Sequence, residues 1–319
     1  MAFRASPRLI DFHSHYYDAA WYPSASPRGP ANLLRAWPLL TNIRAQLEAM
    51  DEAGIGAKVL TAPGSVLLAP GEPLPISLMQ RINDRFAELV AADPQHLLAL
   101  ATIDAFHGEE AAREVERAVQ TLGIPGICVD CARGDRYLDA PEARPSLEIA
   151  AALGIPVFVH PVSPVGLTER LARLGHTGVL LARGTETAAS ILALLRSGIL
   201  DELPTLKIVI PMIGAAALLF AGIANQEYAS DGWQAGPPAE LRKRLYVDTM
   251  GYDPASIRFV VDVLGVEHVI NGSDWPIMPV IASCKLVEGT LYDAGLTHEQ
   301  QAAIMSGNVL RLLTREVVR

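Results

Sequence analysis

The sequence predicts a parallel (β/α)8 barrel formed by one domain that spans residues 1–319. Short apolar runs alternate with longer amphipathic segments along the chain, a pattern typical of parallel strands joined by crossover helices. No linker or change in composition divides the chain. An open doubly wound sheet is the alternative architecture, but no glycine-rich loop follows the first apolar run, so nucleotide binding on such a sheet is unsupported.

Eight apolar runs have the length and composition of strands. They are residues 9–15, 57–63, 97–103, 126–132, 156–161, 207–213, 245–250 and 268–274.

Amphipathic helices are predicted between most of these runs, because apolar residues recur near positions i, i+3, i+4 and i+7. Several of them stop at a glycine, which suits a C-terminal cap. The predicted helices are residues 76–93, 109–123, 144–154, 187–200 and 254–265.

Three segments are expected to be loops over the carboxyl ends of the strands, where a barrel has its mouth. They are residues 16–38, 66–75 and 163–178. The apolar stretch at 208–224 is expected to be a buried strand that leads into a buried helix.

The composition favours a globular protein with a large core, and a cytoplasmic location is expected. Half of the 319 residues are hydrophobic and 19% are charged, which provides material for a large core. The formal net charge of −9 disfavours nucleic acid as a partner. The first residues lack the apolar core of a signal peptide, and no run of about 18 apolar residues predicts a membrane span.

Cys128 and Cys131 have a C-x-x-C spacing, but no second pair accompanies them and the third cysteine, Cys284, is distant in sequence. Positions three apart on a strand face opposite sides. We therefore expect reduced cysteines with no role in zinc binding or redox chemistry.

Polar side chains stand at the ends of three predicted strands. His13 and His15 close the first, His160 the fifth and Asp274 the eighth. Because these ends converge at one face of a barrel, the four residues form a ligand set for a divalent metal ion. Taken singly, the first two histidines also fit a surface loop, His160 fits a hydrogen-bonded core histidine, and Asp274 fits a turn or helix cap.

These motifs resemble the amidohydrolase superfamily, and within it the aminocarboxymuconate-semialdehyde decarboxylase-like branch. LIDFHSH (9–15) is similar to the first-strand motif of that branch, and residues 133–161 resemble its middle section. Residues 184–211 resemble the sixth-strand region, VEHVINGSDWPIMP (266–279) the eighth-strand aspartate motif and SGNVLRLL (306–313) the closing helix. The resemblance implies a metal-dependent barrel enzyme, often dimeric, that acts on a small carboxylated ring or dienoic acid.

The chain differs from the wider family at two strands. Binuclear members have a bridging lysine on the fourth strand, whereas GICVDCAR (126–133) has none, so one metal ion per chain is expected. Zn²⁺ is the first choice for three histidines and an aspartate, and Mn²⁺ is the alternative. Family members usually have a histidine at the end of the sixth strand, where this chain has Met212. A thioether has no proton to give and is at most a weak acceptor.

Three functions are compatible with these residues. The leading hypothesis is a carboxy-lyase (EC 4.1.1) that decarboxylates a small aromatic or unsaturated carboxylic acid, with Asp274 supplying the proton. The second is a hydrolase or hydratase of a small cyclic ester, amide or unsaturated acid, with Asp274 as the base. The third is a catalytically silent barrel that binds a ligand or partner, which Met212 motivates. A homodimer is expected from the resemblance only.

A small carboxylate substrate needs a cation to bind it. Arg133, after the fourth strand, is the first choice for this contact, and Arg183 is the second. A surface salt bridge is the alternative for each arginine.

The substrate also needs an apolar wall. Tyr16, Tyr17, Trp21 and Trp275 follow the strands that end in metal ligands, and they could line the pocket or pack under its loops. Met212 belongs to the same predicted pocket.

Two further histidines could reach the mouth. His107 follows the third strand, with a solvated loop as the alternative, and His176 could replace the missing imidazole. His96 and His268 precede strands and His298 starts a helix, so we expect no catalytic role for these three.

Overall fold

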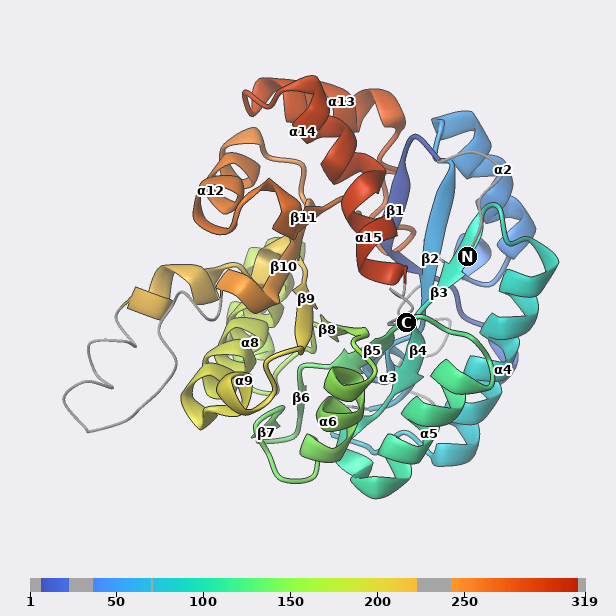
Figure 1. The fold of residues 1–319 in the computed structure, drawn as a ribbon, viewed down its shortest axis with the longest axis vertical. Helices are drawn as coiled ribbons and strands as arrows, with labels where there is room; N and C mark the ends of the chain where they lie inside the picture. Colours follow the sequence, from blue (N-terminus) through green and yellow to red (C-terminus); the bar gives the residue numbers. More distant parts are fainter. Residues whose placement is uncertain (1–6, 23–36, 70, 223–241, 315–319) are drawn as a thin grey trace.

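The computed structural model describes residues 7–22, 37–69, 71–222 and 242–314. Within these ranges, eight parallel strand positions follow one another in chain order around a barrel (Figure 1). The predicted (β/α)8 barrel is therefore confirmed. Its strands are β1 (Ile10–His15), β2 (Ala57–Thr61), β3 (Leu97–Ala99) continued by β4 (Ala101–Ile103), β5 (Ile127–Asp130), β8 (Pro156–His160), β9 (Lys207–Ile210), β10 (Leu245–Asp248) and β11 (Val269–Ile270).

Two irregular places complete the ring of strands. β3 and β4 are halves of one strand on either side of Leu100, and they pair with β2 and β5 respectively. Between the last strand and the first, the backbone N–H of Phe12 donates to the carbonyl of Asn271 at 2.9 Å. The N–H of His15 donates to the carbonyl of Trp275 at 3.0 Å. The barrel is thus closed by main-chain hydrogen bonds even where few residues have regular strand geometry.

The lower barrel is filled with apolar side chains. Phe12, Val59 and Phe158 are fully buried in one cluster, which Val309 and Leu312 of α15 (Asn308–Leu313) close from below. The buried side chains of His13, His15 and His160 stand at the upper end, where β1 and β8 finish. The core therefore supports the mouth of the barrel without occupying it.

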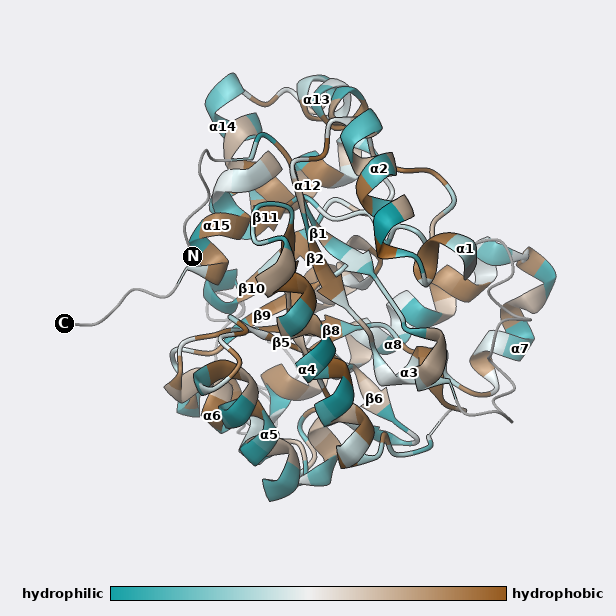
Figure 2. Cartoon of the chain, turned by 90° about the vertical axis from the view of Figure 1, so that its right-hand side faces the viewer, coloured by the Kyte–Doolittle hydropathy of each residue, from teal (hydrophilic) through white to brown (hydrophobic). Residues whose placement is uncertain are grey.

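Amphipathic helices surround the strands. They are α2 (Ile43–Ala53), α4 (Ile76–Ala92), α5 (Glu109–Gln120), α6 (Arg144–Ala152), α8 (His176–Ser197) followed by α9 (Ile199–Glu202), α12 (Pro254–Leu264), α13 (Cys284–Asp293) and α14 (His298–Ala302). Hydrophilic residues lie on the outer side of α4 and α5, while the central strands are mainly hydrophobic (Figure 2). Each predicted helix is present.

Residues 163–178 are helical over much of their length, so the predicted loop was wrong. They form α7 (Leu167–Leu171), a 3-10 turn (Ala172–Leu174) and the first residues of α8. Gly178 allows the start of α8 to pack closely against α7. A Cβ at Gly178 would lie 2.1 Å from the carbonyl oxygen of Leu171, so only glycine permits this approach.

Helix α8 is long and apolar enough to cross a membrane, but half of its apolar stretch is buried inside the molecule. The buried core helix of a globular protein can have the same length and composition, so these two properties are weak evidence for membrane insertion.

The stretch at 208–224 differs partly from the expected buried strand and buried helix. β9 is buried at its end, and residues 216–222 are helical. Leu219 and Phe220 are however 63% and 51% exposed, so this helix presents apolar side chains to solvent. The end of the stretch lies outside the described residues, as do residues 23–36 of the loop predicted at 16–38. Of the loop predicted at 66–75, the first residues close the short helix α3 (Gly64–Leu67).

Cys128 and Cys131 are buried and unpaired, in agreement with the expectation of reduced cysteines, and Cys284 is also free.

Because the strand ends are in close contact at Gly272, we expect any larger side chain there to destabilise the fold. A Cβ there would lie 2.8 Å from the Cβ of His13 and 2.9 Å from that of Asp248. We expect Gly272→Ala to lower the free energy of unfolding by about 1–3 kcal/mol through overpacking, measured by urea denaturation. Gly289→Ala in α13 is the matched control. A Cβ at Gly289 would meet no atom of another element within 4 Å, so the free energy of unfolding should be unchanged or higher. Equal stability of the two variants would contradict the assigned contact.

Candidate metal centre

The first strand contains a β-bulge that prepares the site. Its register against β2 shifts between Asp11 and Ser14. Phe12 and His13, although adjacent, both approach the ring of Phe158 inside the barrel, with centroid distances of 5.5 Å and 4.9 Å. The bulge turns consecutive side chains inward, so the histidines of this strand stand directly above the apolar core.

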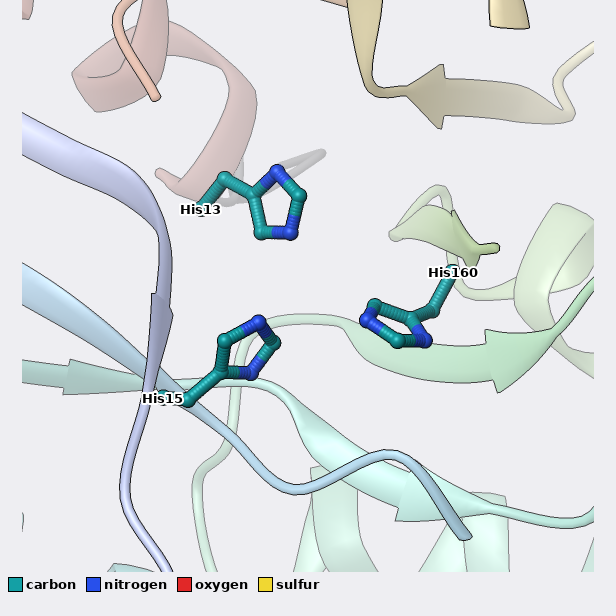
Figure 3. Close-up of side chains that lie close together, drawn as sticks. All are labelled: His13, His15 and His160. Carbon is teal, nitrogen blue, oxygen red and sulfur yellow. The ribbon is translucent and has the colours of Figure 1, made fainter. Parts of the chain in front are cut away.

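Three histidines meet at the mouth of the barrel. His13 and His15 come from β1 and His160 from the end of β8, and one ring nitrogen of each lies within 4.8 Å of the others. Their rings are turned toward one another (Figure 3). All three residues are buried. The structure thus brings together histidines that are separated by about half of the chain.

Asp274 joins this cluster from the turn after β11. Its Oδ1 lies 2.8 Å from Nε2 of His15 and 3.5 Å from Nε2 of His13. The backbone has a φ of 64°, a left-handed conformation that aspartate tolerates better than most residues. Its N–H donates to the carbonyl of His13 at 2.7 Å. The tight turn therefore aims the carboxylate at the imidazoles.

The Nδ1 atom of each histidine faces an oxygen outside the cluster. His13 donates to Asp248 at 2.7 Å, and Thr61 Oγ1 lies 2.9 Å from His15 Nδ1. Asp130 Oδ1 lies 3.6 Å from His160 Nδ1. The contacts with Asp248 and Thr61 are of the kind that fixes the orientation and tautomer of an imidazole and leaves Nε2 for a metal ion, whereas the 3.6 Å approach of Asp130 is longer than a hydrogen bond.

Burial and neighbouring charges set the protonation of the cluster. Burial lowers the pKa of His15, and it lowers the pKa of His160 well below the usual value. Burial acts in the same direction on His13, but Asp274 and Asp248 outweigh it and raise the pKa. Burial alone would raise the pKa of Asp274, yet the adjacent imidazoles hold it below its ordinary value. At neutral pH this carboxylate is ionised, the form that binds a metal ion.

Of the two predicted arginines, Arg183 lies at the histidine cluster. Its Nη2 is 3.5 Å from Nε2 of His160 and donates to the carbonyl of Pro161 at 2.9 Å. Arg133, the first choice from sequence, is ion-paired with Asp104 at 2.9 Å and donates to the carbonyl of Phe106. Arg183 is therefore the arginine at the cluster and Arg133 is engaged by the loop after β4, while the carboxylate contact expected of each stays a prediction.

Among the predicted aromatic residues, Tyr17 lies beside the cluster, with its ring stacked on His15 at 6.3 Å. Tyr16 packs against Trp21, and Trp21 against a phenylalanine of α4, in the layer between strands and helices. Trp275 is buried, with Lys58 Nζ over its ring at 5.0 Å. Tyr16, Trp21 and Trp275 are all buried, and the contact with a substrate that the sequence predicted for them stays a prediction.

The remaining candidates lie outside the cluster. His107 is fixed by a 2.9 Å contact from its Nε2 to the carbonyl of Leu74, and His176 is exposed at the start of α8. The Met212 side chain packs partly buried against the core. Its N–H donates to Asp248 at 2.8 Å. Within the described residues, the structure places no fourth imidazole at the cluster.

A cavity of about 400 Å³ opens at the same end of the barrel as the histidines, although none of the three histidines is among the described residues that line it. It lies between the loops that follow β2, β4, β5 and β8, at the carboxyl ends of the strands. The Asp130 side chain, which approaches His160, also lines this cavity. Barrel enzymes generally bind their substrates at this end of the strands.

Residues 10–315 match the family described as amidohydrolase, which covers nearly the whole chain. The chain belongs to the amidohydrolase family. A gamma-resorcylate decarboxylase from Polaromonas sp. strain JS666 is 30% identical over 71% of this chain and 74% of the relative. A 2-amino-3-carboxymuconate-6-semialdehyde decarboxylase from Dictyostelium discoideum is 26% identical over 75% of this chain and 67% of the relative. These relatives confirm the branch that the sequence motifs indicated.

One solved structure supports the fold of this amidohydrolase. A dihydroxybenzoic acid decarboxylase from Polaromonas sp. JS666 superposes with a TM-score of 0.77 over 96% of each chain, at 23% identity. That enzyme was solved with bound manganese and the inhibitor 2-nitroresorcinol.

The residues of this amidohydrolase fit a divalent metal ion. Nε2 of His13 is buried and has no hydrogen-bond partner within the described part of the chain. An unpaired buried nitrogen is costly unless a ligand satisfies it. Three imidazole nitrogens and one carboxylate oxygen suit Zn²⁺ and are also compatible with Mn²⁺. His13, His15, His160 and Asp274 could therefore hold one metal ion.

The sequence analysis missed the outer partners of the histidines. Asp130, Asp248 and Thr61 all stand at the carboxyl end of a predicted strand. The rule that selected the histidines, a polar residue closing a strand of the barrel, would have selected these residues too.

Metal content tests the cluster directly. We expect the purified amidohydrolase to hold about one equivalent of Zn²⁺ or Mn²⁺, and His13→Ala/His15→Ala to lose it, by elemental analysis. The control, His96→Ala/His298→Ala, removes two exposed imidazoles and should leave the metal content unchanged. Retention of metal by the first double variant would exclude these histidines as ligands.

The outer partner of His13 gives a finer test. Asp248→Asn should weaken metal binding by about 10–100-fold, because an amide no longer fixes the imidazole as the carboxylate does. Competition with a fluorescent chelator measures this constant. Asp262→Asn on the exposed face of α12 is the matched control. An unchanged metal affinity in Asp248→Asn would show that the hydrogen bond has only a structural role.

Proposed function

We propose that this amidohydrolase is a carboxy-lyase that removes CO₂ from a small aromatic or unsaturated carboxylic acid. One observation supports it above all. The Arg183 guanidinium and the Asp274 carboxylate flank the same histidine cluster. A cation that holds a carboxylate and an acid–base group that moves a proton are the two functions that decarboxylation requires. The similarity to enzymes named as decarboxylases of carboxylic acids points the same way.

We propose one divalent metal ion per chain, held by His13, His15, His160 and Asp274. When bound, this ion supplies Lewis-acid polarisation of substrate oxygens. Zn²⁺ is favoured by the donor set. The manganese in the similar dihydroxybenzoic acid decarboxylase supports Mn²⁺ as the alternative. A homodimer and a cytoplasmic location stay predictions from sequence.

Arg183 is proposed to bind the carboxylate that is lost. Its guanidinium is anchored by the carbonyl of Pro161, directly after the β8 histidine. A guanidinium has five N–H donors in one plane. After one of them bonds to Pro161, the others can still bind a carboxylate through two parallel hydrogen bonds.

Asp274 is proposed to transfer the proton. Its carboxylate, which lies beside His15 at the cluster, first accepts a proton from a hydroxyl of the substrate ring. The bond between the ring carbon and the carboxyl carbon then breaks and CO₂ leaves. The electron pair that stays on the ring carbon takes the proton back from Asp274, and the product phenolate is reprotonated by solvent.

The sixth-strand position favours this reaction over hydrolysis. Met212 cannot act as a base toward water, and its nearest polar link is a backbone hydrogen bond to Asp248. Tyr17, fully buried and stacked on His15, shields one side of the cluster from solvent. A proton that moves between substrate and Asp274 needs no activated water.

A panel of hydroxybenzoic and dienoic acids tests the proposal. We expect CO₂ release, measured by mass spectrometry, from at least one acid. With that substrate, Arg183→Gln should raise KM by roughly tenfold or more, because a charge-assisted hydrogen bond of about 1.5–3 kcal/mol is lost. Arg173→Gln, at an exposed arginine of the preceding turn, is the control.

Two other outcomes would contradict the carboxy-lyase. If no acid loses CO₂, while an ester, lactone or amide is cleaved with oxygen taken from labelled water, this amidohydrolase is a hydrolase. Binding of metal and acids without turnover of either class would indicate a silent binding barrel.

A further inference from the structure

We infer that the cavity beside the histidines selects substrates whose far end donates hydrogen bonds or is positively charged, and rejects a second carboxylate. The inference rests on the proposed function and specifies the substrate class of the same site. The favoured class is a small hydroxy acid with an amino or aminoalkyl group on the side of the molecule away from the carboxyl group.

The cavity is placed to receive the far end of a substrate. Its walls come from residues after β2, β4, β5 and β8, next to the end of the barrel that holds the histidines. Arg183 and Glu186 lie three residues apart on α8, a spacing that puts both on one face of the helix. Arg183 lies at the histidine cluster and Glu186 lines the cavity. One face of α8 therefore carries a residue of the histidine cluster and a residue of the cavity wall.

The charges that line the cavity are mostly negative. Five carboxylates and one guanidinium contribute to its wall: Glu72, Asp104, Asp130, Asp135, Glu186 and Arg133. Anions around a low-dielectric cavity repel a second anion and attract donors or cations.

Among the described residues of the wall, Arg133 is the single cation, and it does not offset the negative charge that a ligand would meet. Arg133 donates to Asp104 at 2.9 Å and to the carbonyl of Phe106 at 2.8 Å, and its guanidinium lies over the Phe106 ring. Asp104 also accepts the N–H of Leu74 at 3.0 Å. This pair stabilises the loops of the wall, so the anionic character of the cavity comes from the other carboxylates.

A second observation connects this wall with ligand binding. Nδ1 of His160, a residue that is 1% exposed, has no hydrogen-bond partner within the described residues. It points toward Asp130, which lines the cavity and lies 3.6 Å away. Asp130 is in turn held by the N–H and the hydroxyl of Ser65, at 2.8 Å and 2.7 Å. Asp130 thus connects the cavity wall, through Ser65, with the histidine cluster, through His160.

Among the carboxylates of the wall, Glu186 is the best placed to bind the far end of a substrate. The described contacts give it one weak partner, the Tyr137 hydroxyl at 3.5 Å. A carboxylate with free lone pairs accepts an ammonium or hydroxyl group readily.

Three matched ligands test the inference. They are 2-hydroxybenzoic acids with an aminomethyl, hydroxymethyl or carboxymethyl group at ring position 4 or 5. For the metal-containing enzyme as purified, we expect Kd by calorimetry and kcat/KM for CO₂ release to favour the aminomethyl acid over the carboxymethyl acid by at least about tenfold. The hydroxymethyl acid should be intermediate.

Variants assign the selectivity to the wall. Glu186→Gln should reduce the preference several-fold, and Glu186→Lys should reverse it in favour of the carboxymethyl acid. Asp135→Asn, in an exposed part of the wall, should reduce it as a second and independent change. Glu88→Gln, whose side chain is 65% exposed on α4, changes the net charge equally and should leave the preference intact.

The results separate this inference from the proposed function. CO₂ release with equal or reversed preference in the parent enzyme would overturn the inference and keep the carboxy-lyase. The expected order of Kd values without CO₂ release from any acid would overturn the carboxy-lyase and keep the selectivity. Absence of binding by all three acids would overturn the inference, as would an unchanged preference in both Glu186→Gln and Asp135→Asn.

Discussion

The hydrogen bond between Asp248 and His13, 2.7 Å long and fully buried, is the interaction on which the mouth of this barrel depends. The same carboxylate accepts the backbone N–H groups of Met212 and Met250 at 2.8 Å and 3.0 Å. A buried carboxylate is costly unless several donors satisfy it. By meeting this requirement, Asp248 ties the ends of β1, β9 and β10 together and orients the first imidazole of the cluster.

A second buried carboxylate supports the cluster from outside the barrel. Asp11 accepts the N–H and the hydroxyl of Ser273, at 3.0 Å and 2.5 Å, and so holds the turn that presents Asp274. Burial raises the pKa of Asp11 to about 6 and lowers that of the nearby Lys58 to about 7. The strand before the histidines therefore contributes to the site on both of its faces, inward through imidazoles and outward through the support of the aspartate turn.

The charge distribution divides the mouth into two zones. Arg183 places a cation over the histidine cluster, while the cavity beyond Asp130 and Glu186 is mainly anionic. A substrate with a carboxylate at one end and a donor at the other would meet a complementary charge at each end. Arg183 and Glu186 both lie on α8, so one helix presents a residue to each zone.

The sequence by itself determined the strand order, the helices and the convergence of His13, His15 and His160, because these depend on periodicity and on the rule that parallel strands end at one face. It also identified the missing imidazole at Met212. The tertiary structure decided which arginine reaches the cluster, which aromatic ring lines it and that α8 begins inside a predicted loop. Those outcomes depend on a bulge, on close helix contacts and on competing partners such as Asp104, and contacts between residues distant in sequence leave no local periodic signal.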